Sequence, residues 1–467
     1  MLAAANWTYR LVVVSACALL GLSALCACEP GPQQSKETAS TSAPAPAPGP
    51  KTLTILTPYD ESIRQTFAAG FTSWYQANRG EPVQITWITR GAPQGVRHIV
   101  GLADPKTADG AAGKPDVFFG GGIGAHSYLA EQGLLAKVDP GDVLTGIPAE
   151  VHEVPTRDPE GRWFATGLVT YGIVYNAAAC EERQLTPPQT WRDLGHQRFK
   201  EAIAMADPMV SEIDRDGIVR MFQQFGYVSG WRGTVMALAN SPRLYANRDE
   251  ALALVETGKA LAAIAADYEG RALEAKTAGA VKYADMPQGT SITTAVTSVL
   301  AAAADRELAT DFLRYVLSTE GQSLWCVPLE LREPHGVTLY HHAIAPRIYE
   351  QHGDQLTVKQ NPFETKYALK PDLENDPLMG AFWGAYAHAV TGENHAKLHE
   401  LWHLIVERGM PNMPNMIVAS PKISPQQAVE FGRKVRSATA EELDVMIKQW
   451  IADFDALIDE ARGTMQP

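Results

Sequence analysis

A short histidine motif in the last quarter of the chain has the residue types of a metalloenzyme. His399, Glu400 and His403 form the pattern H-E-x-x-H. On a helix the two imidazoles share one face, where they could bind zinc while Glu400 acts as a general base. Trp402 belongs to an apolar stripe beside them, and Val406 stands where a metzincin has glycine. The motif leaves three alternatives open, a zinc hydrolase, an adventitious or structural metal site, and an amphipathic packing helix, and we favour the packing helix.

A different set of polar residues and glycines follows predicted strands. Gly120, Gly121 and Gly122 come directly after an apolar strand and precede a helix, so their amides could approach an anion. Arg90 and Gly91 follow another strand, and the guanidinium could pair with a carboxylate or phosphate. Ser211 and Glu212 follow a third, where Ser211 could cap a helix and Glu212 could bind a cation or an amine. We expect these residues to meet at one ligand site.

The elements that must position these residues alternate between strand and helix. Residues 52–57, 83–88 and 115–119 have strand patterns, and helical spacing fills the segments between and after them. This order predicts a parallel, doubly wound sheet, in which ligands bind beyond the carboxyl ends of the strands. A second αβ region follows, with a long strand-like stretch at 164–176 and another strand at 262–266.

The N-terminus has the features of an exported lipoprotein. One charge, Arg10, precedes an apolar run that ends in Leu25-Cys26-Ala27-Cys28. The run is short for a membrane span and suits a signal peptide, 1–27, with lipidation at Cys28. Residues 28–50 then form a lipid anchor and a Pro/Ala-rich linker without core-forming side chains. We therefore expect a protein of the periplasm or cell surface that is held at the membrane by lipid.

Composition limits the remaining possibilities. The chain has 467 residues, 45% of them hydrophobic, and a formal net charge of −13, which excludes nucleic acid as the main partner. Five cysteines are too few for a disulfide scaffold, and we expect the two internal ones, Cys180 and Cys326, to be free buried thiols.

Several segments in the correct order resemble one family. The chain from Leu53 to Trp325 is similar to periplasmic solute-binding proteins of ABC importers, in the branch called ferric-iron type. The similar segments are WITRGAPQGVRHIV (87–100), PDVFFGGG (115–122), GIVYN (172–176), TWRDL (190–194), ADP-x-x-SE (206–212), AADYEG (265–270) and ATDFLRYVLSTEGQSLW (309–325).

The resemblance implies an α/β, two-lobed periplasmic-binding-protein fold (type II) whose lobes close on a small ligand. Lobe 1 would comprise 51–165 and 268–330, and lobe 2 would comprise 166–267. The resemblance fades after about residue 330. Helical patterns at 378–390, 393–408, 425–435 and 440–461, broken by prolines at 411, 414 and 421, predict that residues 331–467 form a helical C-terminal extension packed on the body, which we place on the first lobe. The implied partner is an ABC permease in the membrane, and we expect a monomer without a cofactor and without enzymatic activity.

The ligand class stays open between two chemistries. Ferric members of the family commonly carry two adjacent tyrosines, where this chain has Asp267 and Tyr268. With Glu212 these residues could still hold Fe(III) as the transported ligand, while Tyr59 and Tyr171 are further ligand-binding candidates. The alternative is a small phosphorylated or anionic organic compound. A lipid-anchored zinc hydrolase and an extracytoplasmic sensor on the same fold remain the alternative functions.

Overall fold

A five-stranded mixed sheet forms the centre of the first lobe. The computed structural model describes residues 49–103, 113–392, 394–410 and 412–465. Strands β1, β2 and β3 are parallel as predicted, but β12 runs antiparallel to both of its neighbours, β3 and β6, so the sheet is not purely parallel. In spatial order the strands are β2 (Val83–Thr89), β1 (Lys51–Thr57), β3 (Val117–Phe119), β12 (Thr293–Val299) and β6 (Phe164–Val169).

Helices with buried aromatic side chains pack on this sheet. Phe67 and Trp325, from helices far apart in the sequence, lie with ring centroids 4.4 Å apart in the core. Arg79 at the end of α1 makes two hydrogen bonds, of 2.7 and 2.6 Å, to the buried carboxylate of Asp311. These contacts join the first helix of the lobe to its last ones. The helices are α1 (Glu61–Arg79), α2 (Ala92–Ala103), α3 (Ile123–Glu131), α10 (Arg306–Leu317) and α11 (Thr319–Cys326).

A smaller antiparallel sheet with the order β10-β7-β11 forms the second lobe. Its strands are β7 (Tyr171–Asn176), β10 (Ala262–Ala266) and β11 (Val281–Ala284), and a short parallel pair, β8 (Met205–Ala206) and β9 (Leu244–Tyr245), lies beside them. Its helices are α4 (Ala177–Glu182), α5 (Trp191–Leu194), α6 (Glu212–Phe225), α7 (Tyr227–Ala239), α8 (Arg248–Glu256) and α9 (Asp267–Lys276).

The chain crosses between the lobes at two places. The predicted long strand at 164–176 is divided at Thr170 into β6 and β7, which belong to different sheets. The return crossing lies between β11 and β12, because β11 pairs with β7 in the second sheet. The structure thus places α9 and β11 with the second lobe, past the boundary predicted at residue 267.

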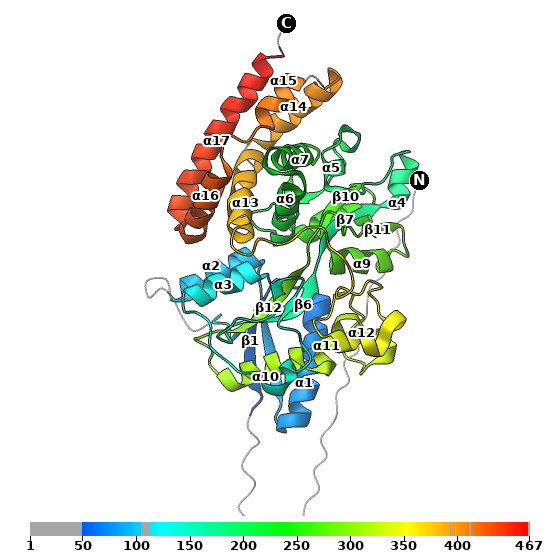
Figure 1. Ribbon diagram of the computed structural model, residues 1–467, viewed down its shortest axis with the longest axis vertical. Coiled ribbons are helices and arrows are strands. Elements are labelled where there is room, and N and C mark those ends of the chain that lie inside the picture. The colour runs from blue at the N-terminus through cyan, green and yellow to red at the C-terminus, as the bar shows by residue number, and fades with distance from the viewer. Residues whose placement is uncertain (1–48, 104–112, 393, 411, 466–467) are drawn as a thin grey trace, which may run out of the picture. The chain divides into compact units, whose positions relative to one another are not determined.

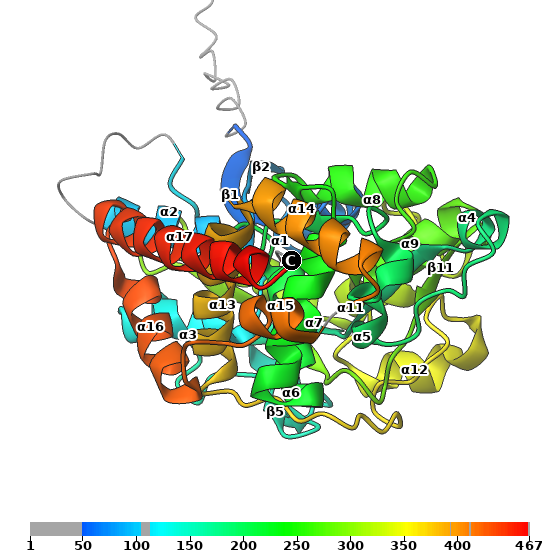
Figure 2. The ribbon, with the colours of Figure 1, turned by 90° about the horizontal axis from the view of Figure 1, so that it is seen from above.

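The C-terminal extension packs on both lobes, whereas the position predicted from the sequence was on the first lobe alone. A segment containing α12 (Pro346–His352) first packs against α11 of the first lobe. Helices α13 and α14 then pack on α6 and α7, and α17 lies along α13 (Figures 1 and 2). Figure 1 shows these helices in orange and red beside the green α6 and α7. They are α13 (Asp376–Gly392), α14 (His395–Glu407), α15 (Asn412–Val418), α16 (Pro425–Ser437) and α17 (Ala440–Gly463).

Among helices α13–α17 of the extension, α14, α16 and α17 are amphipathic and dock through their apolar faces, whereas α13 is buried on nearly all sides. Four of them lie close to the segments that the sequence predicted, whereas α15 was missed because the neighbouring prolines indicated only breaks. Their apolar faces continue the core of the body through stacked aromatic rings: Trp383 of α13 lies 4.5 Å from Phe222 of α6 and 4.8 Å from Trp231 of α7, between ring centroids.

Two predictions concern other parts of the chain. Cys180 and Cys326 are free and buried, as predicted. The signal peptide, Cys28 and nearly all of the linker lie outside the described residues. Within the described ranges, no helix combines the length and the apolar character that crossing a bilayer requires.

Candidate functional site

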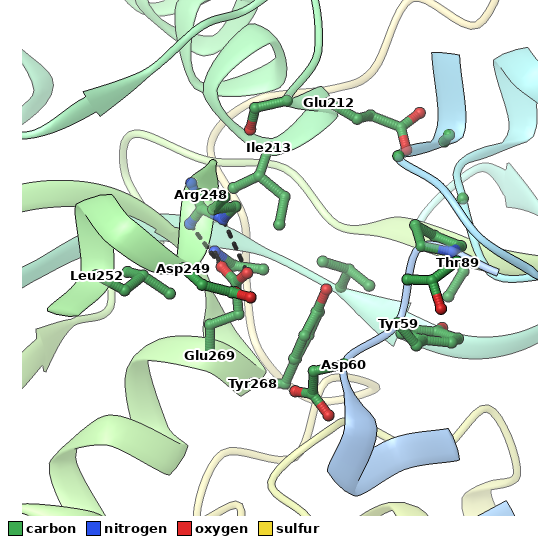
Figure 3. Close-up of a pocket in the computed structure, with 18 of the residues that line it drawn as sticks. Tyr59, Asp60, Thr89, Glu212, Ile213, Arg248, Asp249, Leu252, Tyr268 and Glu269 are labelled. Atoms are coloured by element: carbon green, nitrogen blue, oxygen red, sulfur yellow. Dashed lines mark hydrogen bonds and ion pairs between the residues drawn. The ribbon is translucent and has the colours of Figure 1, made fainter. Parts of the chain in front are cut away.

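A cavity of about 740 Å³ lies between the two lobes, and helices from both lobes begin at its wall. The close-up in Figure 3 shows side chains of the first lobe facing those of the second across it. The predicted site residues that line it are Tyr59, Gly91, Gly121, Gly122, Tyr171, Ser211, Glu212 and Tyr268. The tertiary structure therefore brings most of the predicted ligand residues to one place.

Glycines shape the first-lobe wall where β3 turns into α3. Gly120 and Gly121 have φ values of +95° and +86°, which side chains rarely tolerate. A Cβ at Gly120 would also lie 2.7 Å from the ring of Tyr59. Gly122 is the N-cap of α3 and provides no side-chain cap. The turn thus leaves backbone amides at a helix N-terminus facing the cleft, which favours negative charge.

Glu212 from the second lobe reaches this helix terminus. The Gly122 amide donates toward its carboxylate, and Arg215 lies 3.5 Å from Oε1. The side chain is only 18% exposed. Burial raises the pKa of Glu212 to about 7, with a further contribution from Asp216 that Arg215 and the amide oppose. A carboxylate of the protein itself therefore lies where an anionic ligand would bind.

The guanidinium of Arg248 on the second-lobe wall is already neutralised by carboxylates. It makes two hydrogen bonds to Glu269, of 2.8 and 2.6 Å, and one of 2.6 Å to Asp214 (Figure 3 shows the pair with Glu269). Ser211 donates to Asp214 at 2.6 Å and caps α6, so its hydroxyl is engaged in the helix start. These groups are paired with one another, so they stabilise the cleft wall instead of offering an unpaired charge to a ligand.

Three phenol groups face the cavity. Burial raises the pKa of Tyr59, Tyr171 and Tyr268, and neighbouring carboxylates raise it further. Tyr268 stands between the Arg248–Glu269 pair and Asp60 (Figure 3). At neutral pH these phenols are hydroxyl groups that can donate hydrogen bonds to ligand oxygens.

The structure places three predicted site residues away from the cavity wall. Arg90 is exposed and does not line the cavity, and Gly120 lies beneath the Tyr59 ring. Asp267 is fully buried with its Oδ2 atom 3.2 Å from His342 Nε2, so the predicted ferric set of Glu212, Asp267 and Tyr268 does not converge. Burial raises the pKa of Asp267 to about 7.

Sequence reasoning missed several residues that line the cavity. Arg64 on α1 hydrogen-bonds Thr89 at 3.0 Å and the Asp60 carbonyl at 3.2 Å, so it takes the place at the cleft that was predicted for Arg90. The helical periodicity of this segment could not show that Arg64 faces the cleft, because any arginine on the polar face of a helix fits the same pattern. Arg248 and Asp249 were missed because the strand before them, β9, has only two residues.

The H-E-x-x-H motif does not have the geometry of a hydrolase. Glu400 is 74% exposed and pairs with Arg462 at 2.6 Å. His399 and His403 instead face Glu201 of the second lobe. A general base must lie beside the metal-bound water that it activates, and Glu400 is engaged elsewhere.

Comparisons with known proteins agree with the fold. A family model described as bacterial extracellular solute-binding protein matches residues 112–328. The phosphoglycerate transport regulatory protein PgtC of Salmonella typhimurium is 24% identical over 183 residues, 39% of this chain. The matched region spans 45% of PgtC, which is less than half of that relative.

Two solved structures have the same fold. The periplasmic binding protein P5PA has a TM-score of 0.55 and 20% identity, over 70% of this chain and 94% of its own. AfuA from Actinobacillus pleuropneumoniae, with exogenous fructose-6-phosphate bound, has a TM-score of 0.56 and 18% identity, over 76% and 99%. The predicted resemblance to solute-binding proteins is thereby confirmed: the matching family model describes solute-binding proteins, and both solved structures are periplasmic binding proteins.

Proposed function

We propose that this chain, which has the two-lobed fold of the type II periplasmic binding proteins, captures a small phosphorylated organic compound and delivers it to an ABC permease. A lipid at Cys28 would hold it beside that permease. The chain would act as a monomer, because one pair of lobes makes a complete cleft.

The observation that carries this proposal is the position of Glu212 at the N-terminus of α3. Its carboxylate accepts a hydrogen bond from the backbone amide of Gly122, at the helix terminus that the glycine turn leaves open. A phosphate group has the same hydrogen-bonding chemistry as this carboxylate and a larger negative charge. Ligand phosphate would displace Glu212, and Arg64 at the cleft would provide a cation.

Carboxylates and phenols at the cleft suit the rest of such a ligand. Asp60, Asp249 and Tyr268 line the same cavity and can hydrogen-bond the hydroxyl groups of a sugar or a hydroxy acid. Two relatives support this class, since AfuA has bound fructose-6-phosphate and PgtC is named for phosphoglycerate transport. The cavity suits Fe(III) without a bound anion less well, because Asp267, one of the predicted iron ligands, faces His342 and not the cavity.

A ligand screen on the purified chain tests the proposal. We expect fructose 6-phosphate or phosphoglycerate to raise the melting temperature, and unphosphorylated fructose and ferric citrate to have no effect. Arg64→Met should weaken binding by at least about tenfold, the loss of one charge-assisted hydrogen bond. Arg90→Met is the matched control and should bind normally. Binding of ferric citrate alone, or an equal loss from both arginine variants, would contradict the proposal.

A second candidate function is regulatory, and the name of PgtC favours it. In that case ligand binding would signal to a membrane partner and would not feed a permease. Deleting the gene separates the two functions: loss of uptake of the bound compound indicates transport, while normal uptake with a lost transcriptional response indicates sensing.

A further inference from the structure

Three side chains from two parts of the fold converge outside the ligand cleft. His399 and His403 lie one turn apart on α14 of the extension, and Glu201 lies in the loop before β8 of the second lobe. One ligand atom from each of the three lies within 4.8 Å of the other two. We propose that these residues form a Zn²⁺ site that fastens the C-terminal extension to the second lobe.

The distances suit a metal better than a hydrogen-bonded ion pair. His399 Nε2 and His403 Nε2 lie 3.4 and 3.5 Å from the same oxygen, Oε1 of Glu201. Tetrahedral zinc with bonds of about 2.0–2.1 Å separates adjacent ligand atoms by about 3.3 Å. A charge-assisted hydrogen bond is shorter, at about 2.7–2.9 Å. In the same chain, His388 and Asp207 show such a pair at 2.6 Å.

The imidazoles are oriented for coordination. Nδ1 of His399 lies 3.0 Å from the carbonyl oxygen of Ala239, so this nitrogen carries a proton, while Nε2 faces Oε1 of Glu201 at 3.4 Å. Nε2 of His403 is a buried atom without a hydrogen-bond partner among the described residues.

The backbone around the site also holds these ligands in place. Glu201 has φ = +61°, a conformation that residues other than glycine adopt rarely and that recurs at ligand sites. Trp402, between the two histidines, donates a 2.7 Å hydrogen bond from Nε1 to Asn240 Oδ1 of the second lobe. The hydrogen bond of Trp402 thus holds the two histidines of α14 beside the second lobe, where the exposed side chain of Glu201 faces them.

A structural role follows from the position of Glu400. It pairs with Arg462 on α17, so no carboxylate of the motif is placed to activate a zinc-bound water. A water molecule or the nearby Glu407 could complete the coordination of Zn²⁺. The ion would link the loop at Glu201 to α14, and Lys200 is the adverse charge beside it.

Zinc binding to the purified full-length chain, stripped with a chelator, tests this proposal. We expect one Zn²⁺ per chain by elemental analysis, a rise in melting temperature with Zn²⁺, and the intense visible absorption of four-coordinate Co²⁺. Removing an outer-shell partner costs about 10–100-fold in metal affinity, so removing a ligand, as in His403→Gln, should cost at least about 100-fold. Hydrogen exchange in 395–407 should slow when zinc is added.

Two further variants separate the site from adventitious binding to a histidine pair. Glu201→Gln keeps the size of the side chain and should also weaken binding strongly, because the third ligand comes from the second lobe. Glu400→Gln, one residue from His399, should leave stoichiometry and affinity unchanged. Full zinc affinity in Glu201→Gln, or an equal loss in Glu400→Gln, would overturn the proposal, as would the absence of stoichiometric zinc or cobalt binding. Circular dichroism confirms that each variant is folded.

Discussion

Replacing Glu212 with glutamine should stabilise the protein at alkaline pH. Glutamine has the same shape, and its carbonyl oxygen can still accept from the Gly122 amide, but it cannot ionise. In the native structure burial disfavours the charged form of Glu212, whose pKa rises from 4.5 to about 7. Ionisation of this side chain therefore opposes folding.

The sign and size of the effect follow from this pKa. Between pH 4.5 and 7 the native state binds more protons at Glu212 than the unfolded state does, so stability falls as pH rises. One pKa unit corresponds to about 1.36 kcal/mol, and the full difference to about 3 kcal/mol above pH 7. We expect Glu212→Gln to gain up to about 3 kcal/mol relative to wild type at pH 8.5, and to gain little below pH 4.5.

Urea unfolding at several pH values between 4.5 and 8.5 measures this gain. Glu350→Gln, at an exposed position on α12, is the control and should not change the pH profile. Asp267, whose pKa is also raised to about 7 by burial, acts in the same direction, so Glu212→Gln should reduce the pH dependence without abolishing it. Equal or lower stability of the variant at pH 8.5 would refute the reasoning.

The same variant distinguishes the two ligand chemistries. If the ligand carries a phosphate, removing the competing negative charge should strengthen binding, by about tenfold or more above pH 7. If Glu212 were a ligand to Fe(III), glutamine should weaken binding. Isothermal titration with fructose 6-phosphate and with ferric citrate gives opposite signs for the two cases.

Three further perturbations test the anchor and the extension. Cys28→Ala should move the protein from the membrane fraction to the soluble fraction, and unchanged membrane retention on cell fractionation would disprove lipidation there. Trp402→Ala should lower the free energy of unfolding by about 3–5 kcal/mol, because it removes a buried ring and leaves Asn240 without its 2.7 Å partner; a loss below about 1 kcal/mol in urea unfolding would argue against tight docking of α14. Gly432→Ala should weaken the packing of α16 on α13 and lower the melting temperature, since a Cβ there would lie 2.1 Å from the carbonyl oxygen of Leu378. Gly463→Ala is the control: a Cβ at this position meets no atom within 4 Å, so the melting temperature should stay nearly unchanged.

Local patterns in the sequence determined the elements and the general class of the protein. Alternating apolar residues fix strands such as β1, and i, i+3, i+4 spacing fixes helices such as α1 and α16, because each pattern gives one buried face. The strand-to-helix turn at Gly120–Gly122 could also be recognised, since its positive φ values require glycine. These features were sufficient for an αβ body with ligand groups at the strand ends, and the resemblance to the solute-binding family implied its two lobes.

Only the tertiary structure decided which of these groups face the ligand. Asp267 and Tyr268 are adjacent in the sequence, but Tyr268 lines the cavity while Asp267 points to His342, which lies in the predicted extension. The sequence favoured Arg90 because it follows a strand, yet Arg64 on α1 lines the cleft and Arg90 does not. The partner of His399 and His403 is almost two hundred residues earlier, at Glu201. Local periodicity carries no information about such long-range neighbours, because they depend on how α14 and the second lobe pack against each other.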